Sequence, residues 1–301
     1  MSDIYPPVQK PYLRNCEIIE EGVFPAGMHR VALSIEYNGA QFHGFQKQTS
    51  GVRTVQECLE RALSQVADEK ITTVCAGRTD AGVHGTNQVL HFDTLAVRPD
   101  KAWVKGVNAK LPDTISVRWA KSISAKFHAR FSANNRTYRY VICNSITRPS
   151  LAHDQMTWER RAMNVPLMQE AAGILVGEHD FTSFRATQCQ AKSPVRRIHH
   201  IHIVRRGDLV IPEIKANAFL HHMVRNIVGV LTAVAVEKKP VSWVADVLLA
   251  KDRTKGGKTA SPNGLHLVLV DYPEAFDLPV VLPGPHCCPE PIGGLKNDDE
   301  S

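Results

Sequence analysis

The ten residues from Ala76 to Gly85 hold the pair of side chains in this chain that most suggests chemistry. Arg78 and Asp80 lie two positions apart in the glycine-rich run AGRTDAGVHG. Glycines let the backbone turn sharply and approach a ligand closely, and an arginine beside a carboxylate keeps it ionised. The pattern favours one presented carboxylate at Asp80. The spacing alone leaves a second interpretation open, a turn-capping aspartate with Arg78 as its surface partner.

A helix predicted over 218–236 carries a second group of candidate residues. His222, Arg225, Asn226 and Gly229 follow the i, i+3, i+4, i+7 spacing of one helix face. They form a polar stripe on an otherwise apolar helix, where an unpaired buried arginine is costly. The arginine therefore needs a ligand or a buried partner, and a structural salt bridge or a side chain reaching solvent would explain it equally.

The segment 135–140, NRTYRY, alternates as a strand. Tyr138 and Tyr140 share one face, and Arg139 lies on the other. An aromatic ring flanked by arginines suits a nucleic-acid base stacked beside a phosphate. Sequence alone favours the alternative, core tyrosines with solvated arginines.

Histidine-rich and lysine-rich segments raise two further hypotheses. His200 and His202 share a strand face, but no spaced Cys, Asp or Glu completes a metal-ligand set. The adjacent His221 and His222 lack the i, i+4 spacing of a helical metal pair. The stretch 251–258 suits either a phosphate-contacting loop or a solvated charged loop. These patterns predict no metal site.

Composition indicates a globular protein of one large or two modest domains, with 301 residues of which 43% are hydrophobic. The apolar run 227–236 is too short to span a bilayer, and no secretory leader is evident. The seven cysteines include no C-x-x-C pair and favour a reducing cytoplasm. The net charge of +6 is compatible with a nucleic-acid partner.

The predicted elements follow one order twice, β-α-β-β-α-β, the second time with an extra helix. Residues 29–130 contain expected strands at 31–37, 71–75, 87–93 and 115–122, and helices at 54–67 and 99–111. Residues 131–282 contain expected strands at 137–143, 196–204, 209–216 and 265–270, and helices at 165–176, 218–236 and 242–250.

This order predicts an α+β fold of two ferredoxin-like halves. Their mainly antiparallel sheets are expected to join side by side around a basic cleft. Residues 1–28, rich in proline, are expected to form an extended N-terminal arm. Residues 283–301, rich in Pro and Gly and ending in charge, are expected to be disordered.

Four ordered segments together resemble the tRNA pseudouridine synthase A family, of the gammaproteobacterial type. They are CAGRTDAGVHG at 75–85, FHARFSA at 127–133, DFTSFRA at 180–186 and AFLHHMVRNIVG at 218–229. The resemblance covers roughly residues 30–279. It implies an isomerase that forms pseudouridine at positions 38, 39 and 40 of the tRNA anticodon stem-loop, as a homodimer without metal or organic cofactor.

The resemblance also implies roles for single residues. Asp80 stands at the catalytic aspartate, Tyr138 at the tyrosine that stacks on the target uracil, and Arg225 at the arginine paired with the carboxylate. Leu265 corresponds to a pocket leucine. Two further basic residues are expected to contact the RNA, Arg78 in the gap left by the displaced base and Arg185 on the backbone.

Two functions of other classes stay open beside this one. A catalytically silent RNA-binding module or tRNA-folding factor would suit the same fold, and a zinc hydrolase would use the histidines. The chemistry of the isomerase also leaves two routes open. Asp80 either attacks C1′ of the ribose or removes the 2′ proton.

Overall fold

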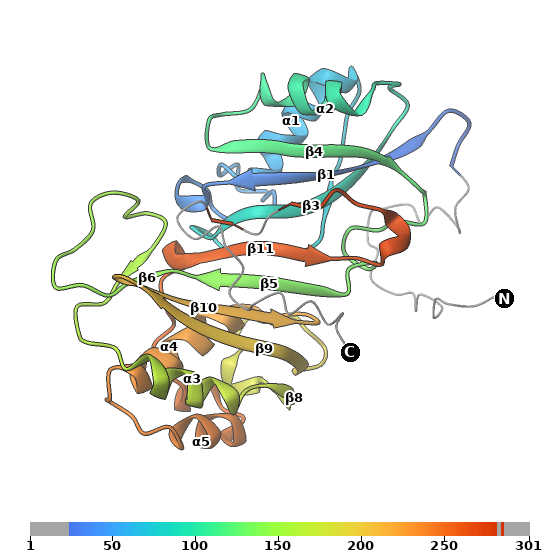
Figure 1. The fold of residues 1–301 in the computed structure, drawn as a ribbon. Helices are drawn as coiled ribbons and strands as arrows, with labels where there is room; N and C mark the ends of the chain where they lie inside the picture. The colour runs from blue at the N-terminus through green and yellow to red at the C-terminus, as the bar shows by residue number, and fades with distance from the viewer. Residues whose placement is uncertain (1–23, 282–283, 286–301) are drawn as a thin grey trace, which may run out of the picture.

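The computed structural model describes residues 24–281 and 284–285 (Figure 1). Its first half contains β1 His29–Tyr37, α1 Val55–Ala67, β2 Val74–Cys75, β3 His84–Thr94, α2 Asp100–Asn108 and β4 Ile115–Ile123. Its second half contains β5 Asn135–Tyr140, β6 Ile142–Cys143, β7 Thr157–Trp158, α3 Val165–Gly173, β8 Gly177–Asp180, β9 Val195–Arg206, β10 Leu209–Ala216, α4 Met223–Ala235, α5 Trp243–Ala250 and β11 Leu265–Asp271.

All eleven strands of the described chain belong to one sheet. Its main path runs β4-β1-β3-β11-β5-β10-β6-β7, with β2 beside β3, β9 beside β10, and β8 beside β9. The paired strands are antiparallel except for β3–β11 and β6–β7. The expected α+β class with a mainly antiparallel sheet is therefore confirmed.

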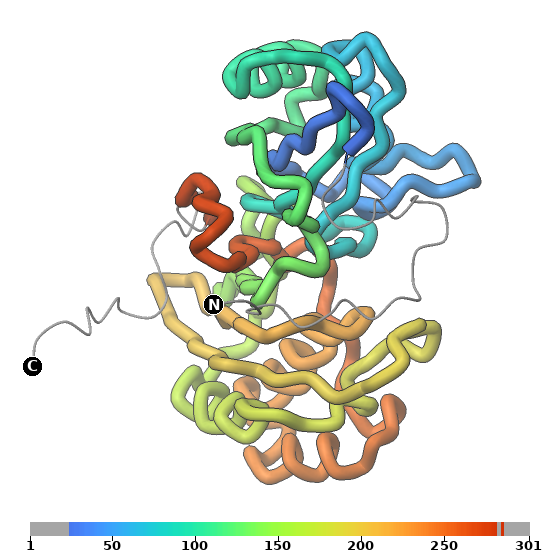
Figure 2. The backbone as a smooth tube through the Cα atoms, turned by 90° about the vertical axis from the view of Figure 1, so that its right-hand side faces the viewer, coloured from blue at the N-terminus to red at the C-terminus, as the bar shows by residue number. Residues whose placement is uncertain are grey.

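The last strand of the chain joins the two halves. β11 lies between β3 of the first half and β5 of the second, and pairs His266 with His84 and Leu267 with Gly85 along β3. Figure 2 shows this red segment between the blue N-terminal elements and the yellow and orange C-terminal ones. A single strand thus sets how the two halves meet.

The helices pack in two separate cores. α1 and α2 pack against β1, β3 and β4, where Leu59 and Trp103 are fully buried. α3, α4 and α5 pack near β9 and β10, where Ile227 and Val244 are fully buried. Within the described residues, no helix has the length and apolar character needed to cross a membrane.

Local sequence explains several element boundaries. α1 begins after Thr54 because the Thr54 hydroxyl accepts a hydrogen bond from the backbone N–H of Glu57. Two expected strands differ from the structure. Only Val74–Cys75 of the expected strand 71–75 pairs in the sheet, and the expected strand 137–143 is divided at Val141 into β5 and β6.

Arg139 is buried, so the expectation that it is solvated is wrong. Its side chain is fully buried, and its Nε donates to Oε2 of Glu213 at 2.7 Å, directly across from it on β10. Burial acts to raise the pKa of Glu213, but the neighbouring His200 and Arg139 lower it overall. The sheet therefore contains a buried ion pair between β5 and β10.

The two ends of the chain lie largely outside the described residues. The expected N-terminal arm 1–28 is described only from residue 24 onward, and the expected tail 283–301 only at Gly284 and Pro285. The carbonyl of Gly284 accepts a hydrogen bond from Arg139, and Pro285 is buried. These two residues therefore belong to the folded part of the protein.

Replacing Arg139 with methionine should lower the free energy of unfolding by about 3–5 kcal/mol, because Glu213 would remain buried without its arginine. The double variant Arg139→Met/Glu213→Leu should recover most of that loss. Urea unfolding of the three proteins measures both effects. Equal unfolding midpoints for the single variant and the parent would contradict a stabilising role for the pair.

Candidate functional site

Asp80 lies on the loop between β2 and β3, and hydrogen bonds hold this loop against other parts of the first half. The Thr79 carbonyl accepts a hydrogen bond from the Phe45 N–H at 3.0 Å, and the Thr79 hydroxyl lies 2.8 Å from the Tyr37 hydroxyl. Gly82 has a φ of +78°, which a side chain rarely tolerates. The glycine-rich run therefore forms a fixed turn that presents the aspartate.

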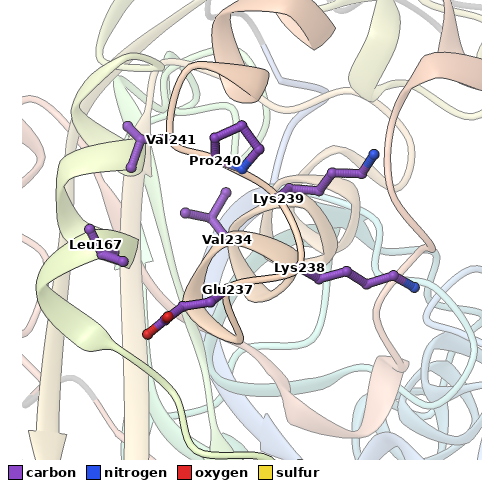
Figure 3. A pocket seen from close by; sticks show the side chains of 7 residues that line it. All are labelled: Leu167, Val234, Glu237, Lys238, Lys239, Pro240 and Val241. Atoms are coloured by element: carbon purple, nitrogen blue, oxygen red, sulfur yellow. The ribbon is translucent and has the colours of Figure 1, made fainter.

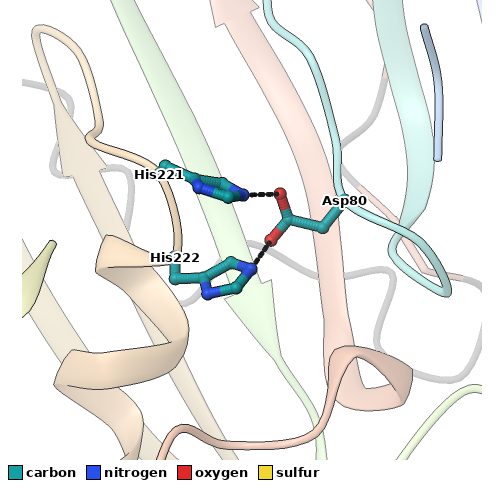
Figure 4. A group of neighbouring side chains, drawn as sticks. All are labelled: Asp80, His221 and His222. Atoms are coloured by element: carbon teal, nitrogen blue, oxygen red, sulfur yellow. Dashed lines mark ion pairs between the residues drawn. The ribbon is translucent and has the colours of Figure 1, made fainter. Parts of the chain in front are cut away.

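The Asp80 carboxylate faces three side chains from the second half. Arg225 Nη1 lies 3.3 Å from Oδ2, His221 Nε2 lies 3.3 Å from Oδ1, and His222 Nε2 lies 3.4 Å from Oδ2 (Figure 4). The Asp80 side chain is 24% exposed and that of Arg225 is 13% exposed. Asp80 is thus paired with Arg225, whereas Arg78 is an exposed residue of the loop.

The segment 258–260 crosses α4 and orients the Arg225 side chain. Its Nε donates to the Ala260 carbonyl at 2.8 Å, and the Ala260 N–H donates to the Arg225 carbonyl at 3.1 Å. The crossing is possible because Gly229 has no side chain. A Cβ there would lie 1.9 Å from the Lys258 carbonyl oxygen. The glycine thus permits the contact that orients the arginine.

The start of α4 differs from the expected helix 218–236. The helix begins at Met223, because His222 takes the left-handed conformation with a φ of 62°. His222 is therefore the N-cap, and the polar stripe is divided among different tasks. Asn226, for example, is buried and donates to the Phe184 carbonyl at 2.7 Å.

The segment 180–186 holds the backbone of His221. The Ala186 N–H donates to the His221 carbonyl at 2.9 Å. Burial lowers the pKa of His222, the charge of Asp80 opposes this, and the charges of His221 and Arg225 lower it further. The pKa of His222 is therefore lowered overall, which favours the neutral imidazole.

Tyr138 lies on β5 close to this site. The residue is 8% exposed, and its ring meets the Phe219 ring edge to face, with centroids 5.1 Å apart. Burial raises the pKa of Tyr138, and the charge of Asp80 raises it further, so the hydroxyl stays protonated. Leu265 is buried at the start of β11, and Arg185 is half-buried at the end of a short 3-10 helix, Thr182–Phe184.

Arg136 is a structural residue that the sequence did not single out. Its guanidinium donates to the carbonyls of Ala76, Arg130, Ala133 and Asn217. These carbonyls belong to, or directly precede, three of the four motif segments. Both terminal nitrogens of Arg136 are thus used within the protein, so Arg136 does not serve as a phosphate-binding arginine beside Tyr138.

Comparison with known proteins places these residues in a family. The sequence profile of the family described as "tRNA pseudouridine synthase" matches residues 33–132 and 171–273. The chain belongs to the tRNA pseudouridine synthase family. Asp80 falls in the first matched region, and Arg185, Arg225 and Leu265 fall in the second. Tyr138 lies between the two.

Curated relatives match over most of the chain. The tRNA pseudouridine synthase A of Pseudomonas aeruginosa is 55% identical over 87% of this chain and 92% of the relative. That of Klebsiella pneumoniae subsp. pneumoniae is 56% identical over 85% of this chain and 94% of the relative. A solved Cbf5-Nop10-Gar1 complex gives a TM-score of 0.30 at 10% identity, covering 78% of this chain and 57% of that one, which supports no argument about the fold.

Among the described residues of this tRNA pseudouridine synthase family member, one group of three could hold a metal ion. Asp80, His221 and His222 each offer a ligand atom, and these atoms lie within 4.8 Å of one another. The sequence did not predict this group, because His221 and His222 fall inside the expected helix 218–236 without the i, i+4 spacing of a helical metal pair. Of the other histidine candidates, His200 lies 3.4 Å from Glu213.

The lysine-rich stretch 251–258 contributes to the support of α4. Arg253 donates to Asn226 at 3.0 Å and to Thr259 at 2.8 Å, so it is not simply a solvated residue.

A pocket at the far end of α4 lies away from Asp80, since Val234 is about 14 Å along the helix from Arg225. Figure 3 shows its lining by Leu167, Val234, Glu237, Lys238, Lys239, Pro240 and Val241.

Replacing Gly229 with alanine should displace the segment at Lys258 and destabilise the protein by at least about 1–3 kcal/mol, as overpacking does. Gly173→Ala is the matched control, because a Cβ at this helical glycine meets nothing within 4 Å. The control should be neutral or stabilising by about 0.4–1 kcal/mol. Thermal unfolding compares the two, and equal melting temperatures would refute the close crossing at Gly229.

Proposed function

We propose that this protein converts uridine to pseudouridine at positions 38, 39 and 40 of the tRNA anticodon stem-loop, with Asp80 as the catalytic residue. The observation that carries the proposal is a half-buried carboxylate, held 3.3 Å from Arg225, in a tRNA pseudouridine synthase family member. The ion pair with this guanidinium holds the carboxylate in place for the reaction.

The chemistry explains why one carboxylate is enough. The enzyme must break the N1–C1′ bond, turn the uracil and join C5 to C1′. A glycosidase needs a second carboxyl group to protonate its leaving group or activate water. Uracil leaves as a delocalised anion, stays bound and returns, so no water is activated. Asp80 either attacks C1′ or removes the 2′ proton.

We propose that four other residues bind the displaced nucleotide and its backbone. The Tyr138 ring replaces the stacking that the uracil loses when it leaves the RNA helix, and Leu265 lines the pocket that holds this uracil. Arg78, exposed on the same loop as Asp80, fills the gap in the RNA. Arg185 is half-buried and directly precedes Ala186, which donates to the His221 carbonyl, and it contacts phosphates of the RNA backbone. The affinity for tRNA should therefore weaken as the salt concentration rises.

We propose further that the two halves are ferredoxin-like units around a basic cleft, and that the protein acts as a cytoplasmic homodimer without metal or organic cofactor. The first half supports this with its β-α-β-β-α-β order. The described cysteines, Cys58, Cys75, Cys143 and Cys189, are free thiols, as a reducing compartment requires.

Replacing Asp80 with asparagine should abolish turnover while tRNA affinity stays near that of the parent, because the carboxylate acts only in the chemical step. Asparagine keeps the size of the side chain, so the fold should survive. Pseudouridine mapping on unmodified tRNA measures turnover, and filter binding measures affinity. A folded variant that still forms pseudouridine at a substantial rate would show that Asp80 is structural. A parent protein that binds tRNA without modifying it would instead indicate a tRNA-folding factor.

Tyr138→Phe and Tyr138→Ala should differ in activity. Phenylalanine keeps the ring and should retain most of the stacking, which is worth about 1–3 kcal/mol for a base on an aromatic ring. Alanine removes it and should lose roughly 5- to 150-fold more in kcat/KM, the equivalent of that energy. Steady-state kinetics on tRNA measure the difference. Equal losses would move the role from the ring to the hydroxyl.

A further inference from the structure

His221 and His222 have no part in the chemistry proposed for Asp80. The isomerisation needs one ionised carboxylate, and Arg225 already lies against it. Yet both imidazoles turn their Nε2 atoms toward the carboxylate, one toward each oxygen, at 3.3 and 3.4 Å (Figure 4). Two nitrogen ligands and one oxygen ligand therefore converge from opposite halves of the protein.

The spacing of these atoms is close to that of a tetrahedral zinc site. Zinc bonds to nitrogen and oxygen are about 2.0–2.2 Å long, which separates neighbouring ligands of a tetrahedron by about 3.3–3.6 Å. The two measured nitrogen–oxygen distances fall in this range, but they end on different oxygens, Oδ1 for His221 and Oδ2 for His222. One ligand atom from each residue lies within 4.8 Å of the others, so rotation of the side chains must bring both nitrogens toward one oxygen to complete the set.

The three residues are held in place and open to solvent. The Asp80 loop is fixed through Thr79, His221 through its carbonyl, and His222 by its position as the N-cap of α4. The side chains are 24%, 42% and 30% exposed, in that order. A cation can therefore enter without unfolding, and the fourth position of the tetrahedron remains free for water.

We propose that Asp80, His221 and His222 form a binding site for a borderline-soft divalent cation such as Zn²⁺, and that its occupancy inhibits the enzyme. Nitrogen ligands favour zinc over magnesium, which prefers oxygen. Arg225 remains on Oδ2 as an outer partner of the bound carboxylate. A carboxylate bound to the cation is unavailable to the ribose, so cation and substrate exclude each other. The binding site stands by itself, whereas the inhibition rests on the proposed function.

Binding is tested on the chelator-treated full chain by calorimetry with Zn²⁺ and by the visible spectrum of Co²⁺. Asp80→Asn and His222→Asn should each weaken binding by more than about 10-fold, the lower end of the cost of losing even an outer partner. Asparagine suits position 222 because it tolerates a positive φ. His202→Gln, which removes an exposed imidazole from another neighbouring pair, is the control and should bind as the parent does.

Inhibition is tested by adding Zn²⁺ to the pseudouridine assay at several tRNA concentrations. The cation should raise the apparent KM for tRNA, and chelator should restore activity. Equal Zn²⁺ affinity in all variants would place the cation elsewhere, for example on thiols, and would overturn the site. Binding without inhibition, or activity that depends on zinc, would overturn the inhibitory role. A protein that forms no pseudouridine either with or without zinc would refute the proposed function and leave the binding result standing.

Discussion

The ion pair between Asp80 and Arg225 is the interaction on which the site depends. Its partners are 145 residues apart in sequence, on a loop of the first half and a helix of the second. They meet because β11 pairs with β3 on one side and β5 on the other. If the halves separated, Asp80 would lose Arg225 and both histidines together. Assembling the sheet and assembling the site are therefore one event.

Backbone carbonyls, more than side-chain partners, aim the charged groups. Arg225 donates to the Ala260 carbonyl, Arg136 donates to the Ala76 carbonyl at the start of the Asp80 loop, and the His221 carbonyl accepts from Ala186. Each contact fixes a position of the main chain, not the identity of a side chain. The site is thus most sensitive to changes that move the backbone, such as a side chain at Gly229.

The sequence predicted single elements well and their long-range contacts poorly. The apolar spacing and the Thr54 cap were enough for α1, and the residue types were enough to select Asp80 and Arg225 as candidates. Three features depend on tertiary contacts that local patterns do not carry. Asp80 is paired across the halves and not with Arg78, Arg139 is buried because Glu213 faces it from another strand, and the left-handed His222 is the N-cap that delays the start of α4 to Met223.

The charges of the site also reconcile two opposing needs. The proposed chemistry requires a negative group at C1′, whereas the RNA backbone is repelled by one. An arginine 3.3 Å from Asp80 offsets the carboxylate locally, and unlike a surface pair it is only 13% exposed, so salt screens it little. In the proposed mechanism, the carboxylate can then meet a ribose without repelling the neighbouring phosphates. The proposal leaves attraction of the RNA to exposed basic residues such as Arg78 and to the net charge of +6. The proposed role of Arg225 thus includes binding as well as chemistry.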